Sequence, residues 1–352
     1  MHKIAVIPGD GRGPEVVAQG LKILEYFNED FQLEEFNIGA ERYLADGEII
    51  PEGILKKLET FDAIYLGAVG DPRVPAGVLE KGILLKLRFY FDQYVNLRPV
   101  KLMKEEYTPL KDKGIEDIDF TVVRENTEGL YAGLGGFFKK GTADEIATQE
   151  MIASRKGVDR IIDYAFNFAK KSGDNSKVTL CDKSNVLTYA HDLWQRTFSE
   201  KCKQYSEVAV DHCYVDALTM KMVRKPEDFD VIVTCNLFGD IVTDLGAELQ
   251  GGMGLSASAN INPEGVSMFE PVHGSAPDIA GENKANPLAA ILAAAMMLEH
   301  FDMNTQAKVV EDAVKQALDE NNITVDMGGH LTTEELGDYI LKLIKKEGGN
   351  DD

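Results

Sequence analysis

The order of apolar and polar residues predicts strands that alternate with helices over most of the chain. Helical periodicity marks residues 14–27 and 77–93, and the chain is mostly helical from about residue 287 onward. Alternating strands and helices are typical of an α/β protein. Short apolar runs that favour buried strands lie at residues 3–8, 62–70, 94–102, 118–126, 177–182, 208–216 and 230–235.

Length and composition predict a soluble globular protein of about two domains. The chain has 352 residues, of which 44% are hydrophobic and 27% charged. Its 59 acidic and 37 basic residues give a formal net charge of -22. This charge argues against nucleic acid or an anionic membrane surface as the main partner. The longest apolar run, at 287–298, is too short to span a bilayer and predicts a core helix.

The cysteines indicate a reducing compartment. Cys181, Cys202, Cys213 and Cys235 are widely spaced and form no CxxC pair. We therefore expect free thiols in a cytoplasmic protein.

The glycine-rich stretch "GDGRGPE" at 9–15 follows the first predicted strand. Glycines at such a position allow backbone N–H groups to approach a phosphate at a helix N-terminus. The spacing is GxGxG, however, and not the GxGxxG of the Rossmann fingerprint. A tight turn from strand to helix is the favoured interpretation, with Pro14 in the first helical turn.

Three arginines lie at or beside predicted strands. Arg88 and Arg98 flank "FYFDQYVN", and Arg124 closes an apolar run. An arginine at such a position is often the partner of a buried carboxylate. Three of them in an acidic chain also suggest a cluster that binds carboxylates bidentately, and hence a small polycarboxylate ligand.

Tyr131 and Lys183 are candidates for proton transfer. Lys183 follows a predicted strand end, and Tyr131 lies seven residues beyond Arg124. Loops after strands carry catalytic groups in many α/β proteins. Both side chains could exchange protons with an alcohol or enol if their pKa values were lowered. Alternatively, the tyrosine packs as an amphipathic residue and the lysine is a surface charge.

Asp240 and Asp244 stand four residues apart in a segment that is otherwise apolar. On a helix they share one face, where like charges repel by a few tenths of a kcal/mol. With Asp216, which ends the predicted strand 208–216, they could bind Mg²⁺ or Mn²⁺, which prefer oxygen ligands. Alternatively, Asp240 caps the helix and Asp244 faces solvent.

Taken together, these stretches resemble the β-decarboxylating dehydrogenases, which include the 3-isopropylmalate, isocitrate, homoisocitrate and tartrate/D-malate dehydrogenases. The similarity covers nearly the whole chain, and its motifs follow the family's order. The motifs are "IPGDGRGPE", "LRPVKL", "VRENTEGLYAG", "DKSNVL", "YVDA", "NLFGDIVTDLGAELQGGMGL" and "EPVHGSAPDIAGENKANP".

The resemblance implies the family's own two-domain α/β fold with an active-site cleft between the domains, and not a Rossmann fold. The first domain would comprise residues 1–99 and 250–352, and the second residues 100–249. A projecting arm at about 130–150 would serve dimerisation in a homodimer with shared active sites.

The resemblance also implies roles for the candidate residues. Arg88, Arg98 and Arg124 would bind the malate carboxylates, and Asp240 and Asp244 would bind Mg²⁺ or Mn²⁺ together with Asp216 of the other subunit. Lys183, also from the other subunit, would help to deprotonate the C2 hydroxyl during hydride transfer. The 2-oxo acid would then lose its β-carboxylate as CO2, and Tyr131 would protonate the enol.

The segment "HGSAPDIAGENKANP" is the implied cofactor site. Its expected cofactor-binding residues are His273, Gly274, Ser275, Ala276, Asp278 and Asn286. NADP-using isocitrate enzymes carry a Lys-Tyr pair where this chain has Asp278 and Ile279. A carboxylate accepts hydrogen bonds from a free ribose diol but repels a 2′-phosphate, so NAD is the expected cofactor.

The expected substrate is 3-isopropylmalate, oxidised and decarboxylated to 4-methyl-2-oxopentanoate in leucine biosynthesis. Leu84, Leu85 and Val186 would form an apolar pocket, where isocitrate dehydrogenases place a serine and an asparagine in the corresponding helix. Such a pocket favours an isopropyl group over a polar one by about 1 to 3 kcal/mol.

Two features of the sequence are also compatible with other substrates of the family. Lys81 lies one turn before Leu85, where a cation could serve a second carboxylate, and "VRENTEG" is closer to the isocitrate and homoisocitrate enzymes. Homoisocitrate, isocitrate and tartrate/D-malate dehydrogenases are therefore alternatives. A catalytically silent regulatory subunit is a further one, although such chains typically lose a catalytic Tyr, Lys or Asp, and all are present here.

Overall fold

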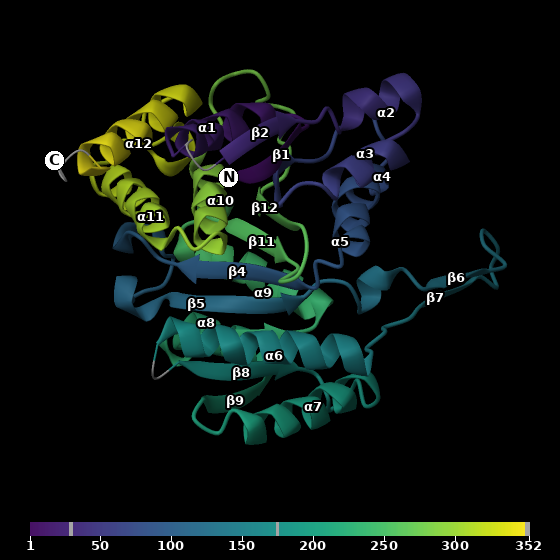
Figure 1. Cartoon of the computed structure of the whole chain (residues 1–352). Helices are drawn as coiled ribbons and strands as arrows, with labels where there is room; N and C mark the ends of the chain where they lie inside the picture. Colours follow the sequence, from purple (N-terminus) through teal and green to yellow (C-terminus); the bar gives the residue numbers. More distant parts are fainter. Residues whose placement is uncertain (28–30, 174–175, 349–352) are drawn as a thin grey trace. The chain divides into compact units, whose positions relative to one another are not determined.

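The computed structural model describes residues 1–27, 31–173 and 176–348 (Figure 1). The chain forms two compact units. The first unit comprises residues 1–93, 102–109 and 250–352, and the second comprises residues 94–101 and 110–249. Both ends of the chain therefore belong to one unit and its middle to the other.

The first unit is built on a mostly parallel sheet in the order β2-β1-β3-β12-β11. Only β11 runs antiparallel to its neighbour β12. The strands are nearly all buried and apolar, as expected of a sheet covered on both faces. Their bounds are β1 His2–Gly9, β2 Phe31–Glu35, β3 Ala63–Ala68, β11 Ala257–Ile261 and β12 Ser267–Pro271.

Helix α10 of this unit is the core helix predicted at 287–298. Apart from its C-terminal end nearly every residue of α10 is buried, and the helix contacts α1, α11 and β12. The bounds are α1 Gly13–Tyr26, α2 Ala40–Asp46, α3 Glu52–Leu58, α4 Val78–Glu80, α5 Lys86–Tyr90, α10 Leu288–His300, α11 Asn304–Asp319 and α12 Thr333–Gly348.

The second unit contains a sheet in the order β4-β5-β10-β8-β9, parallel except for β4. Its strands are β4 Val95–Lys101, β5 Asp119–Glu125, β8 Lys177–Asp182, β9 Ala209–Tyr214 and β10 Val231–Thr234. Its helices are α6 Arg155–Ser172, α7 Ala190–Gln204, α8 Val215–Arg224 and α9 Asn236–Gln250.

A two-stranded antiparallel hairpin, β6 Gly135–Phe138 and β7 Ile146–Gln149, extends away from the other elements of this unit (Figure 1). Every residue of both strands is exposed, including Phe137 and Phe138. Such an arm has no core of its own and would gain stability only from a covering surface.

The structure corrects two predicted elements. The helix expected at 77–93 is interrupted by a π-helical segment, Lys81–Leu85, between α4 and α5. The strand expected at 208–216 ends at Tyr214, whose extended backbone starts α8, so Asp216 lies in the first turn of a helix. A carboxylate is favourable there because the helix N-terminus is the positive end of the dipole.

No helix among the described residues is long and apolar enough to cross a membrane.

The remaining described elements are short. The 3₁₀ turns are Glu105–Tyr107, Ile115–Asp117, Leu130–Ala132, Pro226–Asp228, Met253–Leu255 and Val325–Met327.

Candidate functional site

The carboxyl edge of the second unit's sheet gathers most of the predicted catalytic side chains. β5, β8 and β10 are parallel neighbours, so their carboxyl ends meet at one edge. Arg124 lies at the end of β5, Lys183 directly follows β8, and α9 begins two residues after β10. This edge is where open α/β sheets bind ligands.

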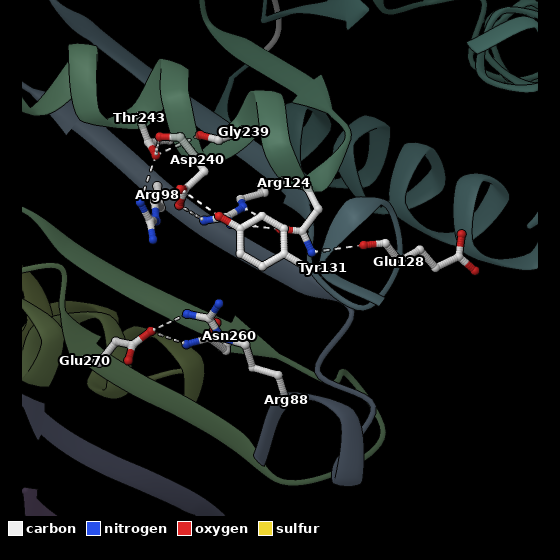
Figure 2. Close-up of polar contacts among 11 residues, drawn as sticks. Arg88, Arg98, Arg124, Glu128, Tyr131, Gly239, Asp240, Thr243, Asn260 and Glu270 are labelled. Carbon is white, nitrogen blue, oxygen red and sulfur yellow. Dashed lines mark hydrogen bonds and ion pairs between the residues drawn. The ribbon is translucent and has the colours of Figure 1, made fainter. Parts of the chain in front are cut away.

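Arg124 is the centre of a polar cluster at this edge (Figure 2). Its Nη1 lies 2.7 Å from Asp240 Oδ1, and its Nη2 donates to Asn236 Oδ1 at 2.8 Å. The Tyr131 hydroxyl donates to Asp240 Oδ2 at 2.9 Å, and the Arg124 guanidinium lies 5.3 Å from the Tyr131 ring centre. Three predicted site residues are therefore in direct contact.

The charges of the cluster offset the repulsion between the paired aspartates in part. Asp240 and Asp244 both lie within α9, so neither caps it. Burial raises the pKa of Asp240, but Arg124, Tyr131 and Arg98 outweigh it and lower this pKa. The pKa of Asp244 is raised by burial and by the charge of Asp240. Arg124 thus offsets one carboxylate, and Asp244 lacks an equally strong counter-charge.

The surroundings of Tyr131 keep its hydroxyl protonated. Its pKa is raised, first by burial and then by the neighbouring Asp240, and is not lowered. The hydroxyl therefore keeps its proton at neutral pH. This state suits a group that donates a proton and does not suit one that removes it.

Arg98 reaches the same helix from β4. Its Nη1 donates to Thr243 Oγ1 at 2.8 Å, and that hydroxyl donates to Gly239 O at 2.8 Å (Figure 2). Arg98 and Arg124 are both buried, and both contact the face of α9 near Asp240. Two guanidinium groups at one helix face can bind a dicarboxylate.

Lys183 forms a second ion pair on the same unit. Its Nζ donates to Asp216 Oδ1 at 2.7 Å, and this hydrogen bond is the main cause of the lowered pKa of Asp216. The Lys183 N–H donates to Nδ1 of the fully buried His191 at 2.9 Å. The buried His191 thus fixes the backbone of Lys183, while the side chain of Lys183 remains partly accessible to solvent.

The predicted metal ligands do not all meet within one chain. Across the described residues, no three His, Cys, Asp or Glu side chains are placed to hold a metal ion together. Asp240 and Asp244 supply two carboxylates one turn apart, and Asp244 carries the raised pKa that a cation would relieve. This donor chemistry fits Mg²⁺ or Mn²⁺, with the third ligand supplied from elsewhere.

Arg88 belongs to the first unit, where it pairs with a carboxylate that the sequence analysis did not identify. Its Nη2 donates to Glu270 Oε1 at 3.0 Å, and Asn260 Nδ2 donates to the same oxygen at 2.8 Å (Figure 2). Arg88 and Glu270 are both buried. Arg88 thus forms the ion pair with a buried carboxylate that the sequence analysis gave as an alternative to substrate binding.

The residues of the predicted apolar pocket lie on different units. Leu84 and Leu85 are half-buried in the π-helical segment, and Leu84 also packs on the core of the first unit. Val186 is 64% exposed on the turn after Lys183 in the second unit. Their assembly into one pocket stays a prediction.

The predicted cofactor segment follows β12 at the carboxyl edge of the first unit's sheet. His273 is 3% exposed, and its Nδ1 lies 3.2 Å from Gly274 O. Burial, and next the charge of Arg12, lower the pKa of His273 to about 4. The imidazole is therefore neutral at physiological pH, and its Nε2 is buried with no hydrogen-bond partner among the described residues.

The other predicted cofactor residues differ in exposure. Ser275 and Asn286 are buried, whereas Gly274 and Asp278 are exposed. Asn286 Nδ2 donates to Asp326 Oδ2 at 3.2 Å, and Ala276 has a positive φ of 39°. The segment is thus a tightly held turn with one free carboxylate at its surface.

Several functional neighbours were absent from the sequence prediction. Asn236, Thr243, Glu270 and His191 each bind a predicted site residue. Asn236 begins α9 just after β10, and Glu270 lies near the end of β12, positions that could have marked them. The contact of the buried Thr243 with Arg98 joins distant elements, for which the sequence offers no signal, whereas His191 lies only eight residues beyond its partner Lys183.

Comparison with known proteins gives a consistent result. The family model described as isocitrate/isopropylmalate dehydrogenase matches residues 3–340. The chain is 53% identical to a 3-isopropylmalate dehydrogenase of Thermobifida fusca and 51% identical to one of Streptomyces griseus. These alignments cover 98% of both sequences and 96% of both sequences, respectively.

A solved structure shows the same similarity. The crystal structure of isocitrate dehydrogenase from Methylococcus capsulatus matches with a TM-score of 0.89 and 37% sequence identity. The match covers 98% of this chain and all of that chain.

Proposed function

Because the chain belongs to the isocitrate/isopropylmalate dehydrogenase family, we propose that it is an NAD-dependent enzyme that oxidises and decarboxylates 3-isopropylmalate. The observation that carries the proposal is the 53% identity to a 3-isopropylmalate dehydrogenase over 98% of both sequences. The cluster of Arg124, Asp240 and Tyr131 supports it, since it combines a carboxylate binder, a metal ligand and an acid.

In this proposal the arginines orient the malate. Arg98 and Arg124 are buried beside α9, so their charges face a ligand in a setting of low dielectric. The substrate carboxylates would replace part of the contact between Arg124 and Asp240. Arg88 would join them after exchanging its bond with Glu270.

Two side chains carry the proton transfers. Lys183 takes the proton of the C2 hydroxyl as hydride leaves for the nicotinamide, and Tyr131 donates a proton to the enol after CO2 is lost. The raised pKa of Tyr131 supports this assignment, because the hydroxyl is fully protonated at neutral pH.

Asp240 and Asp244 would hold Mg²⁺ or Mn²⁺ together with Asp216 of a second subunit. A bound divalent cation draws electrons from the 2-oxo group and so favours loss of the β-carboxylate. Asp240 stays ionised beside Arg124, and Asp244 gains a counter-charge on binding.

NAD is the proposed cofactor, held by the segment that contains His273, Gly274, Ser275, Ala276, Asp278 and Asn286. The exposed carboxylate of Asp278 is free to accept hydrogen bonds from a ribose diol. The neutral imidazole of His273 offers the nucleotide a ring nitrogen that has no partner among the residues the structure describes.

A cytoplasmic homodimer with shared active sites is also proposed. Met220 and Val223 on α8 and Ile241 on α9 are exposed apolar side chains of the kind that a second copy would cover. The exposed hairpin of β6 and β7 supports the same conclusion. The free cysteines are those of a protein in a reducing compartment.

The test is reduction of NAD, followed by the absorbance of NADH, with Mg²⁺ and each of four substrates: 3-isopropylmalate, isocitrate, homoisocitrate and D-malate. We expect strong preference for 3-isopropylmalate and loss of turnover with EDTA. Turnover with none of them would contradict the proposal and favour a silent regulatory subunit.

A tricarboxylate substrate is the second candidate. Lys81 is exposed one turn before Leu85 and makes no ion pair with any residue in the described ranges. A further carboxylate on the substrate would suit this cation. Preference for isocitrate or homoisocitrate in the same assay would select this candidate while leaving the chemistry unchanged.

A further inference from the structure

Arg12 occupies the strand-to-helix turn 9–13, a glycine-rich stretch with no role in the chemistry above. Its Nε donates to Gly274 O at 3.0 Å, and its backbone N–H donates to Ser275 O at 2.8 Å. The guanidinium therefore lies against the segment proposed to hold the adenosine half of the cofactor.

The backbone of this turn is firmly held. Asp10 is buried and accepts hydrogen bonds from Ala40 N at 2.6 Å and from Gly70 N at 3.0 Å. Gly11 has a φ of +57°, and a Cβ there would lie only 2.2 Å from Ser275 O. The position of Arg12 relative to the cofactor segment is thus set by contacts on both sides.

The Arg12 guanidinium is only partly satisfied. Neither Nη atom donates a hydrogen bond to any residue that the structure describes. Burial lowers the pKa of Arg12, and the carboxylates of Asp326 and Asp278 partly offset this. The guanidinium of Arg12 is therefore a half-buried cation whose two amino groups can donate hydrogen bonds to a ligand.

His273 points to the same ligand independently. Its Nδ1 and the Arg12 Nε converge on one carbonyl oxygen, Gly274 O. If Nδ1 donates to that oxygen, the neutral ring presents Nε2 as an acceptor, and Nε2 has no partner in the described part of the chain. A buried acceptor and a cation with open donors thus lie side by side.

We propose that Arg12 is a direct ligand of the adenosine half of the dinucleotide. Its guanidinium plane packs on the adenine base, as arginine does on aromatic faces. Its charge lies close enough to Asp278 to weaken the repulsion between that carboxylate and a 2′-phosphate. Arg12 therefore raises the affinity for the adenosine half and narrows the preference for NAD over NADP. This inference rests on the proposed function.

The test uses the full-length protein and calorimetric titration with three fragments: AMP, 2′,5′-ADP and nicotinamide mononucleotide. Two variants separate the causes. In Arg12→Gln the side-chain amide nitrogen takes the place of Nε, so the bond to Gly274 O is kept while the guanidinium is lost. Arg12→Met loses both.

We expect both variants to bind AMP about five- to tenfold more weakly than the wild type. Binding of 2′,5′-ADP should fall further, and binding of nicotinamide mononucleotide should not change. The ratio of the affinities for AMP and 2′,5′-ADP is thus a readout that a purely structural role would not alter.

Two results would overturn the inference. If Arg12→Gln matches the wild type and only Arg12→Met is impaired, Arg12 merely holds the turn. If neither variant differs from the wild type, Arg12 does not meet the nucleotide. Failure of the wild type to bind both NAD and AMP would instead overturn the proposed function, so the two failures are distinct.

Discussion

Two ion pairs of the second unit differ in how completely the chain itself surrounds them. The Arg124 side chain is 1% exposed, and Asp240, Asn236 and Tyr131 hold it from three sides. Lys183 and Asp216 contact each other, but their side chains are 24% and 67% exposed. Residues of the same chain thus bury and orient the arginine of the first pair. The lysine of the second pair lacks the burial that a catalytic lysine needs.

This difference separates two ways of building an active site. A ligand that reaches Arg124 meets a desolvated, oriented cation and competes with Asp240 for it. Lys183 gains a comparable setting only when another surface covers it, which agrees with the proposal that it serves a site shared between subunits. Substitutions in each pair test whether the two pairs differ in burial alone or also in catalytic role.

The largest effect is expected from Lys183→Met. Removing the base should lower kcat about a hundred- to ten-thousandfold. The unfolding free energy should change by less than about 0.5 kcal/mol, because the ion pair is exposed. Steady-state kinetics and urea denaturation measure the two quantities.

Lys170→Met is the matched control, since Lys170 forms a similarly exposed pair with Glu207. It should leave kcat unchanged. Loss of activity in Lys170→Met, or loss of stability in Lys183→Met, would mean that the pair of Lys183 and Asp216 is structural and not catalytic.

Asp240→Asn should affect both activity and stability. Arg124 would keep its burial but lose its counter-charge, which we expect to cost about 1 to 3 kcal/mol, less than for a fully buried pair because Asp240 is partly exposed. Mn²⁺ binding by calorimetry should be lost as well. Unchanged stability would show that Arg124 does not depend on Asp240.

Mixing two inactive variants tests whether the active sites are shared. Tyr131→Phe lacks the acid, and Lys183→Met lacks the base. If each site takes these residues from different subunits, refolding an equal mixture should restore about a quarter of the wild-type activity, because half of the dimers are hybrids with one intact site. No recovery, with mixed dimers confirmed by mass spectrometry, would place both residues in one subunit's site.

The smallest effect is expected from Asp244→Asn in EDTA. The pKa of Asp244 is raised in the folded chain, so its charge costs stability above that pKa, and the cost disappears as the pH falls through it. The variant should therefore unfold about 1 to 2 °C higher than the wild type at neutral pH and match it at acid pH. Added Mn²⁺ should stabilise the wild type alone.

Local sequence was sufficient for the α/β class and for much of the site. Apolar runs predicted the strands that became β5, β8 and β10, and local motifs marked Arg124, Lys183 and Asp240 as candidate site residues. The motifs around these residues also identified the family. All of these features depend on periodicity and on residues near each other in the chain.

Other features depended on tertiary contacts. The strand predicted at 208–216 was wrong at Asp216, which lies in a helix, and periodicity did not indicate the π-helical segment inside the helix predicted at 77–93. The pKa of Tyr131 is raised because folding buries it beside Asp240, 109 residues away. Arg88 meets Glu270 across 182 residues of the chain, and Arg12 meets Gly274 across 262. Periodicity describes which face a residue occupies, but burial and charge are set by whatever distant segment packs against that face.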